Sequence, residues 1–101
     1  MAASMTGDEV FGILKTIIVG ALRVPPDQVH REANLFVDLD AESIDLVDIR
    51  FQIEEKFGFR IEQEQFASSL GAGEQFDVQK SFTVERVVAF VMEQLSVQDS
   101  Q

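Results

Sequence analysis

The sequence of 101 residues contains no cysteine and a single histidine, His30. Without cysteine the chain forms no disulfide, has no thiolate nucleophile and offers no sulfur ligand to zinc or an iron–sulfur cluster. One histidine also excludes a zinc site of the HExxH type, so we expect no metal site of these kinds. No apolar run approaches the roughly 20 residues of a membrane-spanning helix. A basic stretch followed by an apolar one is missing near the N-terminus, so we expect no signal peptide and a cytoplasmic location.

Basic residues are also scarce. Eight Lys and Arg stand against 18 Asp and Glu, which gives a formal net charge of −10. DNA and RNA are therefore excluded as partners, because affinity for them depends on Lys and Arg at the phosphates. A basic protein surface suits this charge better. With 46% apolar residues, the chain is expected to form one modest core, with little room for a deep active-site cleft.

The apolar residues follow helical spacing, and no segment alternates cleanly as a strand would. The spacing predicts helices from about Asp8 to Leu22, from Ser43 to Phe57 and from about Val84 to Leu95, with a short helix within Glu62–Leu70. We expect one all-α domain over residues 1–101, ordered from about residue 8 to 95, with a frayed tail at 96–101. It is a monomeric bundle of three main helices plus a short one, with an extended segment before the last helix.

Local signals predict where these helices begin and end. Thr6 and Glu9 have the spacing of a capping box, and Thr83 is a suitable N-cap for the last helix. Pro25 ends the first helix, and Gly58 ends the second. The connection from residue 23 to 42 is long, and its apolar residues are expected to contact the core: Val29, Ala33, Leu35, Phe36 and Leu39.

The predicted second helix has two apolar faces, whereas a single core needs one. The core face is formed by Leu46, Ile49, Ile53 and Phe57. A stripe rich in acids follows the spacing i, i+3, i+7, i+10 and consists of Asp45, Asp48, Gln52 and Glu55. Beside it lies a second apolar strip, Ile44, Val47 and Phe51, which Arg50 and Glu54 separate from the core face. This strip either packs under the segment after Gly58 or docks a basic partner.

Ser43 stands at or next to the N-cap of this helix. It either only caps the helix or carries a phosphodiester near the positive end of the helix dipole, which nearby carboxylates would oppose. A catalytic serine is not indicated, because no base is apparent and the G-x-S-x-G pattern is missing. An EF-hand over Asp38, Asp40 and Glu42 fails, because Ser43 stands where glycine is needed and Ile49 where a bidentate glutamate is needed.

The run DLDAESIDLVDI, from Asp38 to Ile49, resembles acyl carrier proteins around their phosphopantetheine-attachment site. The similarity continues through Ile53–Phe57 and at Thr83–Val84. It implies a carrier, not an enzyme, in which Ser43 bears covalent 4′-phosphopantetheine whose thiol holds acyl chains as thioesters. The implied partners are a phosphopantetheinyl transferase and acyl-transfer or fatty-acid synthesis enzymes with basic docking patches. The implied partner-binding residues are Glu42, Ile44, Asp45, Val47, Asp48, Phe51 and Glu55.

The chain departs from the ordinary carrier in length. Twenty-one residues, Glu62 to Phe82, separate Ile61 from Thr83 and hold several apolar residues: Phe66, Leu70, Phe76, Val78 and Phe82. This suggests a carrier similar to those that serve long or unusual acyl chains for lipid A, with an acyl pocket near Val47, Ile61 and Phe66. Arg50 stands where the family commonly has an apolar residue. A polyketide or peptidyl carrier and an unmodified acidic interaction module remain alternatives.

Overall fold

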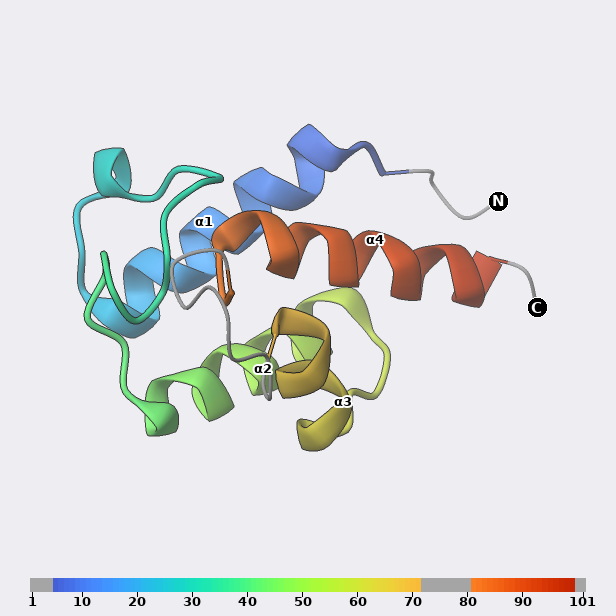
Figure 1. The fold of residues 1–101 in the computed structure, drawn as a ribbon. Coiled ribbons are helices and arrows are strands. Elements are labelled where there is room, and N and C mark those ends of the chain that lie inside the picture. Colours follow the sequence, from blue (N-terminus) through green and yellow to red (C-terminus); the bar gives the residue numbers. More distant parts are fainter. Residues whose placement is uncertain (1–4, 72–80, 100–101) are drawn as a thin grey trace.

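The computed structural model describes residues 5–71 and 81–99. Within these ranges the elements are α1 (Gly7–Leu22), a short 3-10 turn η1 (Pro26–Gln28), α2 (Ser43–Phe57), α3 (Gln63–Leu70) and α4 (Val84–Asp99), as Figure 1 shows. In this part of the chain the only extended pairing is an isolated bridge between Asn34 and Thr83. The predicted all-α bundle of three main helices and a short one is confirmed.

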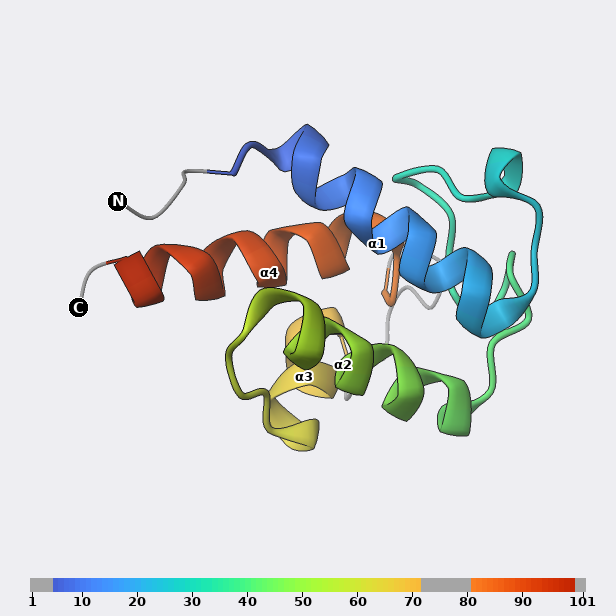
Figure 2. The ribbon, with the colours of Figure 1, turned by 180° about the vertical axis from the view of Figure 1, so that it is seen from behind.

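The helices form a bundle in which α1 and α4 lie side by side, with α2 and α3 beneath them in Figure 1. Seen from behind, α2 runs below α1 (Figure 2). Helix α1 packs against both α4 and α2, and α3 packs mainly against α4. The contact between α2 and α3 is the smallest of those between helices in the described ranges. Helix α3 is therefore anchored mainly on α4, and α2 mainly on α1.

The predicted helix ends are largely confirmed because they depend on short-range contacts. Thr6 Oγ1 accepts from the Glu9 N–H at 3.1 Å, and the Glu9 carboxylate accepts from the Thr6 N–H at 2.9 Å. Helix α2 ends at Gly58, whose φ of 83° favours glycine. Thr83 Oγ1 accepts from the Arg86 N–H at 3.2 Å and so caps α4. The starts of α1 and α3 differ from their predicted positions by one residue.

The core lies between the helices and extends under the connection from α1 to α2. Phe66 is fully buried and contacts Phe90 edge to face, with ring centroids 5.4 Å apart. Phe36 in the connection is half-buried, whereas four other apolar residues of the connection are buried, as predicted: Val29, Ala33, Leu35 and Leu39. The connection is therefore part of the folded core and holds the start of α2 in place.

Helix α4 is longer than predicted. It continues to Asp99, four residues beyond the expected end at Leu95. Its apolar stripe does fade there, since Val97 is exposed. The prediction of a frayed tail from residue 96 was wrong for residues 96–99, because no proline or glycine interrupts the backbone hydrogen bonds. None of the described helices is long and apolar enough to cross a membrane.

The stretch 72–80 lies outside the described residues, and with it lie three residues that the sequence singled out: Gly73, Phe76 and Val78. The described residues on its two sides meet. The Phe82 N–H donates to the Leu70 carbonyl at 2.7 Å. A Cβ added to Gly71, which has a φ of 116°, would lie 2.7 Å from Ser81 Oγ. Leu70 and Phe82, on the two sides of this stretch, are therefore joined directly.

Arg31 ties the connection to two helices. Its guanidinium lies 2.6 Å from the Asp8 carboxylate of α1 and 3.1 Å from the Glu85 carboxylate of α4. The hydrogen bond to Glu85 is the main reason why the pKa of Arg31 is raised above its ordinary value. The guanidinium also lies over the Phe11 ring, 5.0 Å from its centroid. The beginning of the connection is thus held against the ends of α1 and α4.

Candidate functional site

Ser43 is the first residue of α2 and its side chain is exposed. The residue at the N-cap is Glu42, so Ser43 stands next to the cap, which is one of the two predicted positions. The Asp45 carboxylate accepts from the Glu42 N–H at 2.9 Å and closes the first turn. The interpretation that Ser43 only caps the helix is therefore wrong, and its hydroxyl faces solvent at the positive end of the α2 dipole.

The loop before Ser43 is held by Asn34, a buried residue that sequence reasoning missed. Its Oδ1 accepts from the N–H groups of Phe36 and Val37 at 2.8 and 2.9 Å, and its Nδ2 donates to the Ser81 carbonyl. The Asp38 carboxylate accepts from the Asn34 N–H at 2.8 Å. In the sequence, the signal for this role was that Asn34 is a polar residue between two apolar ones. Asn34 thus positions the loop that leads to Ser43 and joins it to the start of α4.

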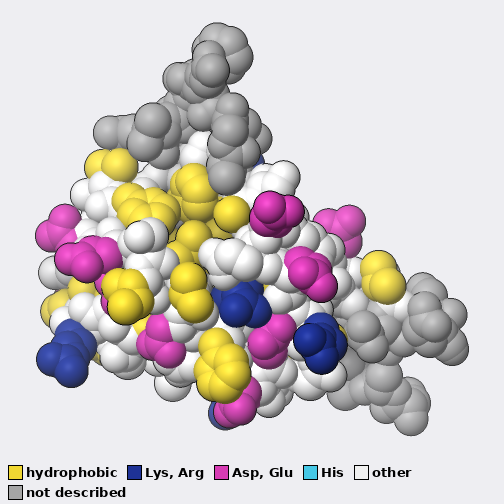
Figure 3. Space-filling model, turned by 90° about the horizontal axis from the view of Figure 1, so that it is seen from below, with side chains coloured by type: hydrophobic (Ala, Val, Ile, Leu, Met, Phe, Trp, Pro, Cys, Tyr) yellow, Lys and Arg dark blue, Asp and Glu magenta, His cyan; other side chains and the backbone are white. Residues whose placement is uncertain are grey.

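The second apolar face of α2 is open to solvent. Ile44, Val47 and Phe51 are 70%, 42% and 51% exposed, and we call these three residues the α2 strip. The face of α2 opposite to it is buried through Leu46, Ile49 and Ile53. The interpretation that the α2 strip packs under the segment after Gly58 is therefore wrong. Hydrophobic side chains with acidic ones around them are visible from below in Figure 3.

Carboxylates accompany the α2 strip along the helix. Asp48 and Glu55 are exposed, Asp45 is half-buried, and Glu42 is exposed at the N-cap. Gln52 donates to the Asp48 carboxylate at 3.1 Å and so belongs to the same stripe. Exposed apolar anchors with charges at their rim are typical of surfaces that dock an oppositely charged protein.

The three residues named for an acyl pocket lie in different environments. Ile61 and Phe66 are buried in the core, whereas Val47 is exposed on α2. The exposed Val47 and the two buried residues do not line a described cavity together. The pocket stays a prediction, and it would form where an attached chain enters between the helices.

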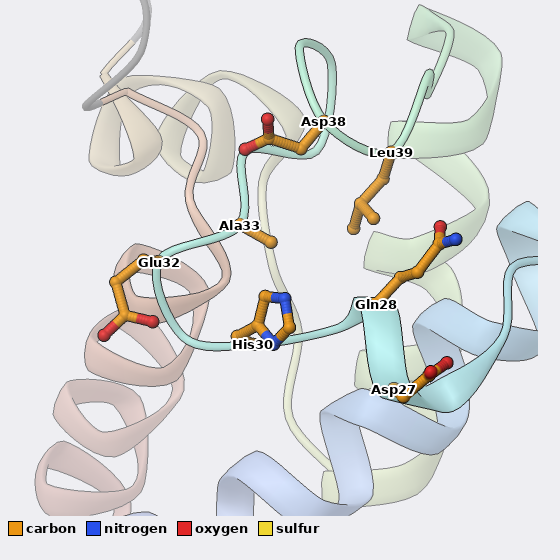
Figure 4. A pocket seen from close by; sticks show the side chains of 7 residues that line it. All are labelled: Asp27, Gln28, His30, Glu32, Ala33, Asp38 and Leu39. Carbon is orange, nitrogen blue, oxygen red and sulfur yellow. The ribbon is translucent and has the colours of Figure 1, made fainter.

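A cavity of about 380 Å³ opens in the connection between α1 and α2, lined by Asp27, Gln28, His30, Glu32, Ala33, Asp38 and Leu39. In Figure 4 the carboxylates of Asp27, Glu32 and Asp38 point in different directions. Asp38 is occupied by its hydrogen bond to the Asn34 backbone. Over residues 5–71 and 81–99, no three His, Cys, Asp or Glu side chains gather as metal ligands would. We assign no role to this cavity.

The bundle and the exposed serine define a class of protein, a small helical domain to which a group is attached and presented. The family model described as "Phosphopantetheine attachment site" matches residues 12–76. An acyl carrier protein of Petrotoga mobilis is 38% identical over 95 residues, 94% of this chain and 98% of that protein. An acyl carrier protein of Thermotoga maritima is 33% identical over 88 residues, 87% of this chain and 94% of that protein. The chain belongs to the acyl carrier protein family.

Membership establishes the general role. The protein is an acyl carrier, and its cofactor is covalently attached 4′-phosphopantetheine. Members of the family are carriers and not catalysts, and they interact with phosphopantetheinyl transferase and fatty-acid synthesis enzymes. An "Acyl carrier protein 2" of Ralstonia nicotianae is 36% identical over 70 residues, 69% of this chain and 86% of that protein.

Proposed function

We propose that Ser43 bears the 4′-phosphopantetheine arm on which this protein carries acyl thioesters. The observation that carries the proposal is the position of Ser43, exposed at the first residue of α2 with capping left to Glu42. On loading, the Ser43 hydroxyl attacks the phosphopantetheine phosphate of coenzyme A, forms a phosphodiester and releases 3′,5′-ADP. The positive end of the α2 dipole favours the phosphate, and the nearby carboxylates oppose it.

The lack of cysteine makes the test of Ser43 simple. The terminal thiol of the arm would be the only thiol of the loaded chain, because the sequence has no cysteine. After incubation with a phosphopantetheinyl transferase and coenzyme A, we expect one thiol per chain and a mass increase of one phosphopantetheine. Ser43→Ala should abolish both, whereas Ser68→Ala, on the exposed surface of α3, should leave both unchanged. Loading that survives in Ser43→Ala would refute the assignment, and a chain that is never loaded would be an unmodified interaction module.

We infer that partner enzymes dock on the α2 strip and its acidic rim. The strip supplies apolar contact area, and Asp45, Asp48 and Glu55 attract a basic patch on the partner. Glu42 lies at the same end as Ser43, where a partner would have to approach the arm. This arrangement supports a docking site for the transferase and for acyl-transfer enzymes.

The acyl chain itself is proposed to shelter against the bundle. A thioester-bound fatty chain exposes many methylenes, and each contributes about 0.8 kcal/mol when it is buried. Ile61 and Phe66 are buried in the core and Val47 is exposed on α2, which supports entry of the chain beside α2 near Val47. The acylated protein should then melt at a higher temperature than the unacylated one. A melting temperature that is the same for all chain lengths would count against an internal pocket.

The pathway is the finer part of the proposal. We propose fatty-acid or specialised lipid biosynthesis, with the long connection before α4 favouring a dedicated lipid pathway of the lipid A kind. A polyketide or peptidyl carrier is the alternative. Acylation assays with synthetases for fatty acids, malonyl or hydroxyacyl units and amino acids separate these classes. The expected monomeric state and cytoplasmic location stay predictions.

A further inference from the structure

A group of hydrogen bonds joins α2 to the peptide that leads into α3. Arg50 Nη1 donates to the Ile61 carbonyl at 2.8 Å, and Arg50 Nε donates to Gln63 Oε1 at 2.6 Å. Glu54 Oε2 accepts from the Ile61 N–H at 2.7 Å and lies 3.3 Å from Arg50 Nη1. Side chains one turn apart on α2 therefore hold both backbone polar groups of Ile61. We call Arg50, Glu54, Ile61 and Gln63 the α2–α3 latch.

The latch is stronger than an ordinary surface ion pair. The Arg50 and Glu54 side chains are only 19% and 23% exposed, so water and salt screen them weakly. Both also bond to backbone groups, and hydrogen bonds with an ionised partner are about twice as strong as neutral ones. The latch therefore adds a polar connection between α2 and the peptide that leads into α3.

The latch lies on the path that an attached chain would take. Arg50 is seven residues after Ser43 on α2, which corresponds to about 10 Å along the helix axis. Val47 of the α2 strip is three residues before Arg50, so the two side chains are neighbours on the helix surface. Behind the latch, Ile61 and Phe66 are buried. A chain that enters the core from the α2 strip beside Val47 would therefore pass Arg50 and the Ile61 segment that Arg50 and Glu54 hold.

We propose that the α2–α3 latch sets the shortest acyl chain that the bundle admits. The proposal rests on the proposed function, because it requires an acyl chain on Ser43. Opening the latch has a fixed cost, whereas each further methylene that is buried adds a nearly constant gain. The balance between the two produces a threshold in chain length. Chains below the threshold lie outside on the α2 strip, and longer chains enter between α2 and α3.

The first experiment measures this threshold. The loaded protein is given straight acyl chains of increasing length, from butanoyl to hexadecanoyl, and the melting temperature is measured for each. In the native protein we expect no rise for short chains and a steady rise above a certain length. Arg50→Met keeps the apolar stem and removes the donors, so its rise should begin at shorter chains. The control Arg60→Met makes the same charge change at an exposed neighbour of Ile61 and should behave as the native protein.

Two results of this series would overturn the proposal. One is a rise that begins at the same chain length in the native protein and in Arg50→Met. The other is a rise that begins with butanoyl in the native protein. If Arg50→Met does not fold, Glu54→Ala is tested in the same series. Its control is Glu93→Ala, at an exposed position of α4.

The second experiment detects the latch without any acyl chain. Hydrogen exchange of the Ile61 amide should be about tenfold faster or more in Glu54→Ala, because the amide loses a charged acceptor. Glu54→Gln keeps an acceptor oxygen and should remain closer to the native rate. An unchanged rate in Glu54→Ala would show that the latch is open in solution and would overturn the proposal. If Ser43 takes up no arm, the proposed function and the threshold both fail, while Ile61 exchange still reports the latch.

Discussion

Truncation of Phe51 to alanine should weaken partner binding and leave the fold nearly intact. Full burial of a phenylalanine side chain contributes about 1.5–3 kcal/mol, and Phe51 is 51% exposed in the free protein. About half of that contribution, roughly 1 kcal/mol, is therefore still available to a partner. A loss of this size corresponds to about fivefold faster dissociation from the phosphopantetheinyl transferase. Since the contact is apolar, we expect little dependence on salt.

Reversal of charge on α2 should slow association with a partner and leave dissociation nearly unchanged, which is the opposite of the effect of Phe51→Ala. Asp48→Lys combined with Glu55→Lys changes the net charge by four on one face of α2, which weakens long-range attraction to a basic patch. We expect association with the transferase to slow by about tenfold at low salt. The defect should shrink as salt rises, because exposed charges are screened over about 10 Å at 0.1 M ionic strength. The dissociation rate should change little.

The assay measures association and dissociation rates by surface plasmon resonance at low and at high salt. Circular dichroism and the melting temperature must first show that each variant folds, since Phe51 is half-buried. A double Lys substitution at Glu32 and Glu93, exposed residues outside α2, is the matched control for charge. If the reversal at Asp48 and Glu55 leaves association unchanged at low salt, these carboxylates are only a solvated face and the docking proposal is wrong.

Three further predictions concern stability and the long connection. Asn34→Ala should lower the free energy of unfolding by about 1–3 kcal/mol in urea titrations, because the part-buried N–H groups of Phe36 and Val37 lose their acceptor. Gly58→Ala should cost about 1 kcal/mol by the same measurement, because its φ of 83° strains a side chain. Replacement of residues 72–80 by a short Gly-Ser linker should leave the melting temperature nearly unchanged, since Leu70 and Phe82 already meet. The same variant should be acylated less by its proper partner.

Each of these predictions has a result that would contradict it. An Asn34→Ala protein as stable as the native one would show that water replaces the carboxamide. A neutral Gly58→Ala would mean that α2 ends differently in solution. A linker variant that melts far lower would assign a structural role to residues 72–80, and one that is acylated and transferred normally would make them a tolerated insertion.

The helices were predictable because their signals are local. The capping box of Thr6 and Glu9, the stop at Gly58 and the cap at Thr83 each involve residues within four positions of one another. Such contacts form in the same way in many folds. The extension of α4 to Asp99 was missed for a related reason, since periodicity reports burial, and Ser96 and Val97 are helical but exposed.

The sequence by itself determined what chemistry is open to this protein. The lack of cysteine and the excess of acids exclude thiol chemistry and nucleic-acid partners, because these are properties of residue type. The run from Asp38 to Ile49 resembles acyl carrier proteins, and this resemblance predicts Ser43 as the attachment residue. Whether the α2 strip is covered, where Asn34 makes its bonds and what Arg50 and Glu54 hold were decided only by the tertiary structure. The bond from Asn34 to Ser81 joins residues 47 positions apart, and Glu54 reaches Ile61 beyond the end of α2. The pattern of side chains along one helix does not reveal which backbone group outside that helix each side chain will contact. The packing of the whole bundle decides this.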